Sequence, residues 1–180
     1  VGPLKFTIVR ADPPRYVEFI PREAGGGIKD PNVPANDPRT QFGPNGELPL
    51  ATKFYDFVIM LVPSRELLAL SFKSTGLKVA KQLNGLMGMR NAPCYAGVYE
   101  VMSVMTQNAK GRFAIYSVKN AGWITDKPVF DYARETHQNL VGKTITIEHD
   151  SLDADSFGVE AMERETASAK AAAPGTTESM

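Results

Sequence analysis

Residues 98–119 read VYEVMSVMTQNAKGRFAIYSVK, and this stretch decides the expected fold. Its two arms, 98–105 and 112–119, are rich in β-branched and aromatic residues, which favour strands. The link between them, TQNAKG, ends in Gly111, and glycine readily adopts the positive φ that hairpin links often need. The stretch therefore predicts an antiparallel β-hairpin.

Segments of similar composition surround this hairpin. They predict strands at 5–10, 15–20, 53–62, 67–73 and 143–149. Helices are expected at 75–89, where Ser74 or Thr75 can cap the free N–H groups, and at 128–140, which starts with a proline. Short strands with one helix between strand groups predict a mainly β, β-rich α+β fold. Its simplest form is a small OB-like Greek-key β-barrel with one or two helices.

The stretch 21–50 is rich in Pro, Gly, Asn and Asp and has no hydrophobic period. This composition predicts a long Pro/Gly-rich loop within the barrel domain. Loops of this length in compact domains are usually functional or mobile. A solvated connector is favoured over a segment that clasps a ligand.

The zero formal charge of the chain hides an uneven distribution. Residues 1–147 contain 18 basic and 12 acidic residues, a net charge of +6, whereas residues 148–180 contain 2 basic and 8 acidic residues, a net charge of −6. We therefore expect a folded domain at 1–149 and a flexible acidic C-terminal tail at 150–180. The basic domain should attract polyanions, and the tail can compete for the same surface or recruit a basic partner.

Several classes of protein find no support in the sequence. The longest apolar run, 57–63, is far shorter than the ~20 residues of a membrane span, and the N-terminus lacks a signal-peptide pattern. A single cysteine, Cys94, predicts cytoplasmic residence. His137 and His149 lie in no catalytic motif, and the acidic residues of the domain are scattered. We therefore expect no enzyme, metal site or cofactor.

Nucleic-acid binding has more support, because aromatic and basic residues alternate along the predicted strands. Single-strand binders combine a cationic groove for phosphates with aromatic faces on which bases stack. In the arm 112–119, side-chain alternation places Phe113 and Ile115 on a face that suits the core, and Arg112 and Tyr116 on the other. The residues expected to contact nucleic acid are Phe72, Lys73, Lys78, Lys81, Arg90, Tyr99, Lys110, Arg112, Tyr116, Lys119 and Trp123.

Three segments resemble a family of tailed-bacteriophage proteins: 16–27 (YVEFIPREAGGG), 72–83 (FKSTGLKVAKQL) and 97–123. The resemblance implies single-stranded-DNA binding on an OB-type barrel, beside replication and recombination enzymes in the host cytoplasm. It also implies that the acidic tail recruits replication or recombination proteins. This chain ends in APGTTESM, which departs from the dense acidic and aromatic tip of such tails.

The leading hypothesis is a non-catalytic, non-sequence-specific single-stranded-DNA-binding protein of phage DNA replication or recombination. One alternative is a phage structural or host-modulating protein-interaction module. Another is an enzyme of nucleic-acid metabolism. Steep salt dependence of oligonucleotide binding distinguishes the first hypothesis, because bound phosphates release counterions. The preference between DNA and RNA and a homo-oligomeric state stay open.

Overall fold

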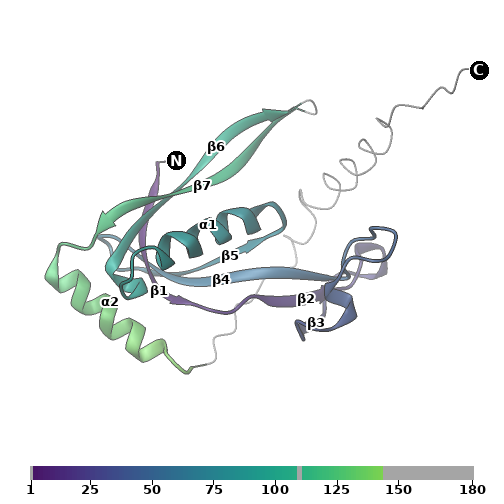
Figure 1. Cartoon of the computed structure of the whole chain (residues 1–180), viewed down its shortest axis with the longest axis horizontal. Helices are drawn as coiled ribbons and strands as arrows, with labels where there is room; N and C mark the ends of the chain where they lie inside the picture. Colours follow the sequence, from purple (N-terminus) through teal and green to yellow (C-terminus); the bar gives the residue numbers. More distant parts are fainter. Residues whose placement is uncertain (1, 109–110, 144–180) are drawn as a thin grey trace, which may run out of the picture. The chain divides into compact units, whose positions relative to one another are not determined.

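The computed structural model describes residues 2–108 and 111–143 of the chain, and within them the fold is mainly β with two helices (Figure 1). The strands are β1 (Leu4–Ala11), β2 (Arg15–Phe19), β3 (Ile28–Val33), β4 (Ala51–Leu61), β5 (Leu67–Lys73), β6 (Gly97–Asn108) and β7 (Gly111–Trp123). The helices are α1 (Leu77–Gly88) and α2 (Lys127–Leu140). The predicted hairpin, helices and β-rich class are confirmed.

All seven strands belong to one antiparallel sheet in the order β3-β2-β4-β1-β6-β7, and β5 pairs with β4 as well. Strand β4 organises the sheet because it has three partners. Its beginning pairs with β2, its end pairs with β1, and β5 runs along its other edge. The long apolar run predicted in this segment thus forms the centre of the sheet.

Strands β1 and β2 follow one another along the same edge of β4 and form one interrupted strand. The interruption contains Pro13 and Pro14. Proline has no N–H to donate to a neighbouring strand, so pairing stops there and resumes at Arg15. The interruption lets β1 pair with β6 on its free edge, while β2 pairs with β3.

The connectivity is compatible with an OB-like fold. The first strand pairs with two others, and α1 lies between the fifth and sixth strands, as a helix does in that Greek-key barrel. The sheet is open within the described residues, because no pairing joins β5 to β7 there. Helix α1 packs against strands on both sides of this opening, β5 and β7.

Two apolar clusters lie on opposite faces of the sheet. On one face, Phe6, Ile8 and Phe57 pack with Ala80 and Leu83 of α1. On the other face, α2 packs against a second cluster, whose buried members are Val9, Val58, Met60, Val129 and Ala133. The sheet therefore has a helix on each face, and surface that is free of helices lies toward its ends.

Some predicted details are wrong. The stretch 21–50 is not one long loop, because Ile28–Val33 pairs with β2 as an edge strand. Neither Ser74 nor Thr75 caps α1; they form a short 3-10 turn, Ser74–Gly76, and the position before the helix is Gly76. The predicted strand at 143–149, beyond its first residue, and the predicted tail at 150–180 lie outside the described residues.

The β6–β7 hairpin reaches well past α1 (Figure 1). Residues 103–107 and 111–117, here called the outer half of the hairpin, are mostly exposed on both faces. The expectation that Phe113 and Ile115 face the core is therefore wrong, since their exposed fractions are 40% and 42%. Neither helix in the described part of the chain is long and apolar enough to cross a membrane.

Candidate nucleic-acid interface

Helix α1 runs along β7 and is fixed there by contacts near both its ends. Phe72, just before the helix, meets Tyr116 edge to face with ring centroids 6.4 Å apart. In the middle, Gln82 Nε2 donates a hydrogen bond to the carbonyl oxygen of Val118, at 3.1 Å. Beyond the C-terminal end, Arg90 bonds the side chain of Asn120. These contacts hold α1 and the segments that flank it against β7.

An aromatic row crosses the sheet at the N-terminal end of α1. Lys53 Nζ lies 5.5 Å from the Tyr16 ring centroid and 5.2 Å from that of Tyr55. Tyr55 stands opposite Phe72 in the β4–β5 register, and Phe72 contacts Tyr116. The aromatic row, Tyr16–Lys53–Tyr55–Phe72–Tyr116, thus passes from β2 through β4 and β5 to β7 on the face that carries α1.

Exposure separates the rings that can stack on a base from those that cannot. Tyr116 and Trp123 are 59% and 53% exposed. Tyr99 and Phe72 are 1% and 3% exposed and belong to the core under α1. The prediction that Tyr99 and Phe72 stack on bases is therefore wrong, because α1 covers both rings.

Arg90 holds Trp123 in position and has little freedom to bind a phosphate. Its guanidinium carbon lies 4.4 Å from the Trp123 ring centroid and 4.9 Å from that of Tyr99. Nη2 also donates to the carbonyl oxygen of Val98 at 3.4 Å, while Nε and Nη1 are buried without a hydrogen-bond partner. Cation–π attraction to both rings accounts for this placement.

The predicted phosphate contacts are spread over several environments. Lys78 and Lys81 are exposed on α1, and Arg112 is exposed on β7. Lys119 bonds Glu100, its partner in the β6–β7 register, with Nζ and Oε1 2.7 Å apart. Lys73 is half-buried at the end of β5, and Lys110 lies outside the described residues.

Three members of the aromatic row were not predicted from the sequence. Tyr16, Lys53 and Tyr55 are half-buried and lie between the core and the end of the sheet. A signal was present, since in Lys53-Phe54-Tyr55 a basic residue is next to aromatic ones, as in the chosen segments. The pairing of Tyr16 with Lys53 depends on the β2–β4 register, which the sequence does not specify.

Arg39 ties the segment after β3 to the edge of the sheet. Its side chain bonds Asp37, Glu18 on β2 and Asp30 on β3 with distances of 2.7 to 3.1 Å, and Lys29 adds a second cation 2.7 Å from Glu18. The Arg39 hydrogen bonds lower the pKa of Asp37 to about 2, and Lys29 followed by Arg39 lowers that of Glu18. The charges of Arg39 and Lys29 are therefore paired with carboxylates of the protein itself, and these ion pairs have a structural role.

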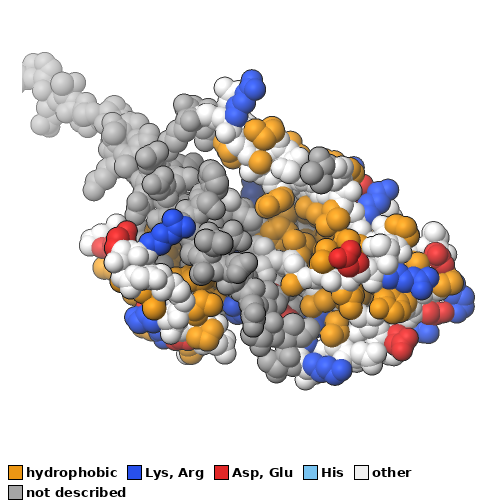
Figure 2. Space-filling model, turned by 180° about the vertical axis from the view of Figure 1, so that it is seen from behind, with side chains coloured by type: hydrophobic (Ala, Val, Ile, Leu, Met, Phe, Trp, Pro, Cys, Tyr) orange, Lys and Arg blue, Asp and Glu red, His pale blue; other side chains and the backbone are white. Residues whose placement is uncertain are grey.

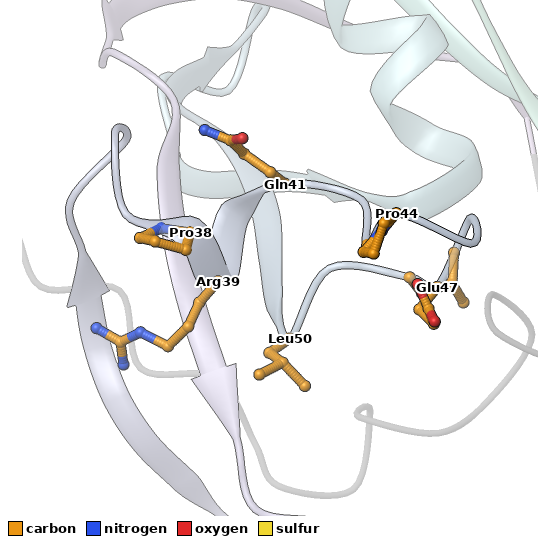
Figure 3. A pocket seen from close by; sticks show the side chains of 8 residues that line it. Pro38, Arg39, Gln41, Pro44, Glu47 and Leu50 are labelled. Atoms are coloured by element: carbon orange, nitrogen blue, oxygen red, sulfur yellow. The ribbon is translucent and has the colours of Figure 1, made fainter.

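A hollow of about 390 Å³ lies in the same segment and is lined by residues between Pro38 and Leu50. Figure 3 shows Arg39 directed toward the strands, while Pro44 and Leu50 border the hollow. Glu47 at its rim accepts hydrogen bonds from Asn45. Since its charged groups are already bonded within the protein, the hollow offers no arrangement for chemistry.

The single cysteine lies near His137, but the geometry does not activate it. His137 Nδ1 is 2.7 Å from the carbonyl oxygen of Val9, which can only accept, so Nδ1 carries a proton. It therefore cannot take a proton from the Cys94 thiol 3.8 Å away. Burial also raises the pKa of Cys94. Among residues 2–108 and 111–143, no group of three His, Cys, Asp or Glu side chains could hold a metal ion.

Figure 2 shows the side-chain types on the surface that faces away from the viewer in Figure 1. Where the described residues are visible, Figure 2 shows Lys and Arg side chains interspersed with hydrophobic and acidic ones.

Comparisons with known proteins gave one match. A family model described as Pam3 phage gp34-like protein matches residues 13–146, which is more than half of the chain. No curated protein and no solved structure matches. The matched range begins just before β2 and includes both helices and the whole candidate interface.

Proposed function

Because the chain belongs to the family of Pam3 phage gp34-like proteins, we propose that it binds single-stranded DNA during phage replication or recombination. Binding would be non-catalytic and independent of base sequence. The observation that carries the proposal is the aromatic row, in which Lys53 lies between the rings of Tyr16 and Tyr55 and the exposed ring of Tyr116 ends the row.

The accessible members of the row, Tyr16, Lys53, Tyr55 and Tyr116, are of the residue types that a single strand needs. Unpaired bases stack on aromatic rings whatever their sequence, while cations between the rings attract the phosphates. Lys78 and Lys81 add exposed cations on α1, and Arg112 adds one on β7, the strand that carries Tyr116. Trp123, which Arg90 holds from one side, offers a second stacking position at the other end of α1.

A direct test measures fluorescence anisotropy of a labelled oligo(dT) and of a duplex of equal length at two salt concentrations. We expect the single strand to bind more tightly, with affinity falling steeply as salt rises. Tyr116→Ala should weaken binding roughly 5- to 150-fold, the equivalent of ~1–3 kcal/mol for one stacked base. Absence of single-strand binding at low salt would disprove the proposal.

Matched controls separate the row from general effects of charge and shape. Tyr132→Ala removes a partly exposed tyrosine from α2, on the opposite face of the sheet, and should leave affinity unchanged. Lys53→Gln should weaken binding, whereas Lys127→Gln, an exposed lysine of α2, should not. Equal losses in both members of each pair would show that the aromatic row is not the binding site.

One observation favours a second candidate, a protein-interaction module. The outer half of the hairpin exposes Val104, Met105, Phe113 and Ile115, which are apolar and do not attract phosphates. If oligonucleotides bind weakly and without salt dependence, this surface rather than the aromatic row becomes the leading functional site.

A further inference from the structure

The outer edge of β7 lacks a strand partner within the described part of the chain, where β7 pairs with β6 alone. The backbone N–H of Val62 bonds the carbonyl of Lys5, so Lys5 faces β4 and its neighbour Leu4 faces β6. Val101, opposite Leu4, therefore faces β1, and Val118, opposite Val101, faces away from β6 to the outer edge. The side chain of Gln82 bonds the Val118 carbonyl there. Backbone groups of alternate residues point to the same edge of a strand. The N–H and C=O groups of Arg112, Ala114 and Tyr116 therefore also point outward.

The surroundings of this edge are unusual for a soluble protein. Natural edge strands are blunted by prolines, charges or short length. β7 is 13 residues long and has no proline, and its outward-pointing stretch 112–116 contains a single charge, Arg112. An isolated two-stranded hairpin is marginally stable in water, and a third strand stabilises it. The outer half of the hairpin thus has the features of an interface.

We propose that this edge pairs with the same edge of a second copy of the chain, which gives a two-fold symmetric dimer with a continuous sheet β6–β7–β7–β6. A second copy fits because the sequence RFAIY, 112–116, is complementary to itself in antiparallel register. With Ala114 opposite Ala114, Arg112 stands opposite Tyr116 and Phe113 opposite Ile115. Cation–aromatic and aromatic–β-branched pairs of this kind stabilise neighbouring strands.

Two other registers, centred on Arg112 and on Tyr116, fit less well. A shift of the centre to Arg112 places two arginines directly opposite each other, which is repulsive. A shift to Tyr116 requires the Val118 backbone, whose carbonyl Gln82 already occupies. The register centred on Ala114 also continues the apolar strip on one face, where Val104 is followed by Ile115 of the same copy and then by Phe113 of the other.

Sedimentation velocity of the full chain without nucleic acid tests the dimer independently of DNA binding. The paired segment is short, and small interfaces are typical of weak complexes, so we expect a reversible dimer with a micromolar Kd. Ala114→Pro removes an outward N–H that β6 does not use, and it should give a monomer with an unchanged circular dichroism spectrum. A wild-type chain that stays monomeric, or a folded Ala114→Pro variant that still dimerises, would overturn the proposal.

A matched pair of variants covers the case in which Ala114→Pro fails to fold. Ile115 and Val104 face each other across the hairpin and are 42% and 38% exposed. Ile115→Glu places a charge beside the partner strand and should abolish the dimer, whereas Val104→Glu lies one strand away and should keep it. Equal dimerisation of the two variants would contradict the proposed interface.

Cross-linking tests the register itself. In a Cys94→Ser background, Ala114→Cys should form a disulfide-linked dimer under mild oxidation, because the two Cα atoms lie within disulfide range in this register. Arg112→Cys alone should not cross-link, since the register places the two copies of this residue far apart. The reverse result would show a different pairing and overturn the proposed register.

Discussion

At the scale of single residues, the position of Arg90 shows how one cation fixes a surface. Its guanidinium lies between a buried ring, Tyr99, and an exposed ring, Trp123. A Cβ atom at position 97 would collide with it, so Gly97 provides the space that it needs. A residue that first suggests a phosphate contact therefore acts mainly by holding an aromatic side chain.

Arg90→Met keeps an apolar stem but removes the charge and its hydrogen bonds. Lost cation–π contacts and a lost charged hydrogen bond should lower the free energy of unfolding by about 2 kcal/mol. Urea denaturation measures the loss, and the fluorescence of Trp123, the single tryptophan, should change in the native state. Arg134→Met, which removes an exposed arginine from α2, should change neither. An unchanged Trp123 spectrum in Arg90→Met would contradict the contact.

Arg39 predicts a response to acid. Asp37 has a pKa of about 2 beside Arg39, against an ordinary value of 3.8, so the native state binds fewer protons than the unfolded state. The stability from this pair is present above pH ~4 and disappears as the pH falls toward 2. The Tm difference between wild type and Arg39→Met should therefore shrink over this range. A constant difference in thermal melts from pH 5 to 2 would refute the assignment.

At the scale of elements, the hairpin changes character along its length. Its base packs in the core through Tyr99 and Val118, whereas both faces of its outer half are exposed. Exposed two-stranded segments open locally at low cost. At protein concentrations low enough to keep the proposed dimer dissociated, we therefore expect the amide hydrogens of the outer half to exchange faster than those of Val98–Val101. Uniform protection along the hairpin would contradict this, and mass spectrometry or NMR can measure it.

The elements also show what a sequence can predict. Patterns of β-branched and aromatic residues located six of the seven strands, and periodicity located both helices. Strand β3 escaped because Lys29, Asp30 and Pro31 are poor strand formers. It forms because Lys29 bonds Glu18 and Arg39 bonds Asp30, and because an edge strand tolerates proline.

The candidate site was harder to predict than the strands. Tyr99 and Tyr116 each lie in a strand with a similar pattern of aromatic and β-branched residues, yet Tyr99 is buried and Tyr116 is exposed. The difference arises from the place where α1 packs, which is a long-range property that local patterns do not contain. For the same reason, the pairing of Lys53 with Tyr16 and Tyr55 became visible only in the folded chain.

At the scale of the whole molecule, the uneven charge of the sequence leads to a prediction about DNA affinity. Deletion of residues 150–180 removes net negative charge, so it should tighten oligonucleotide binding at low salt and have little effect at high salt. Deletion of 166–180 alone removes one lysine and one glutamate and is the neutral control. Equal anisotropy titrations for both deletions would show that the acidic residues do not compete with DNA.

The pairing of β1 also determines how late in synthesis this strand can acquire all its partners. Of the described strands, this one leaves the ribosome first, yet its partners are β4 and, through Leu4 and Val101, the much later β6. Contacts between such distant segments form slowly, because a long loop must close before they gain any free energy. The second edge of β1 should thus remain unpaired in the nascent chain until β6 has been synthesised, and during that interval a chaperone could bind the apolar residues of β1.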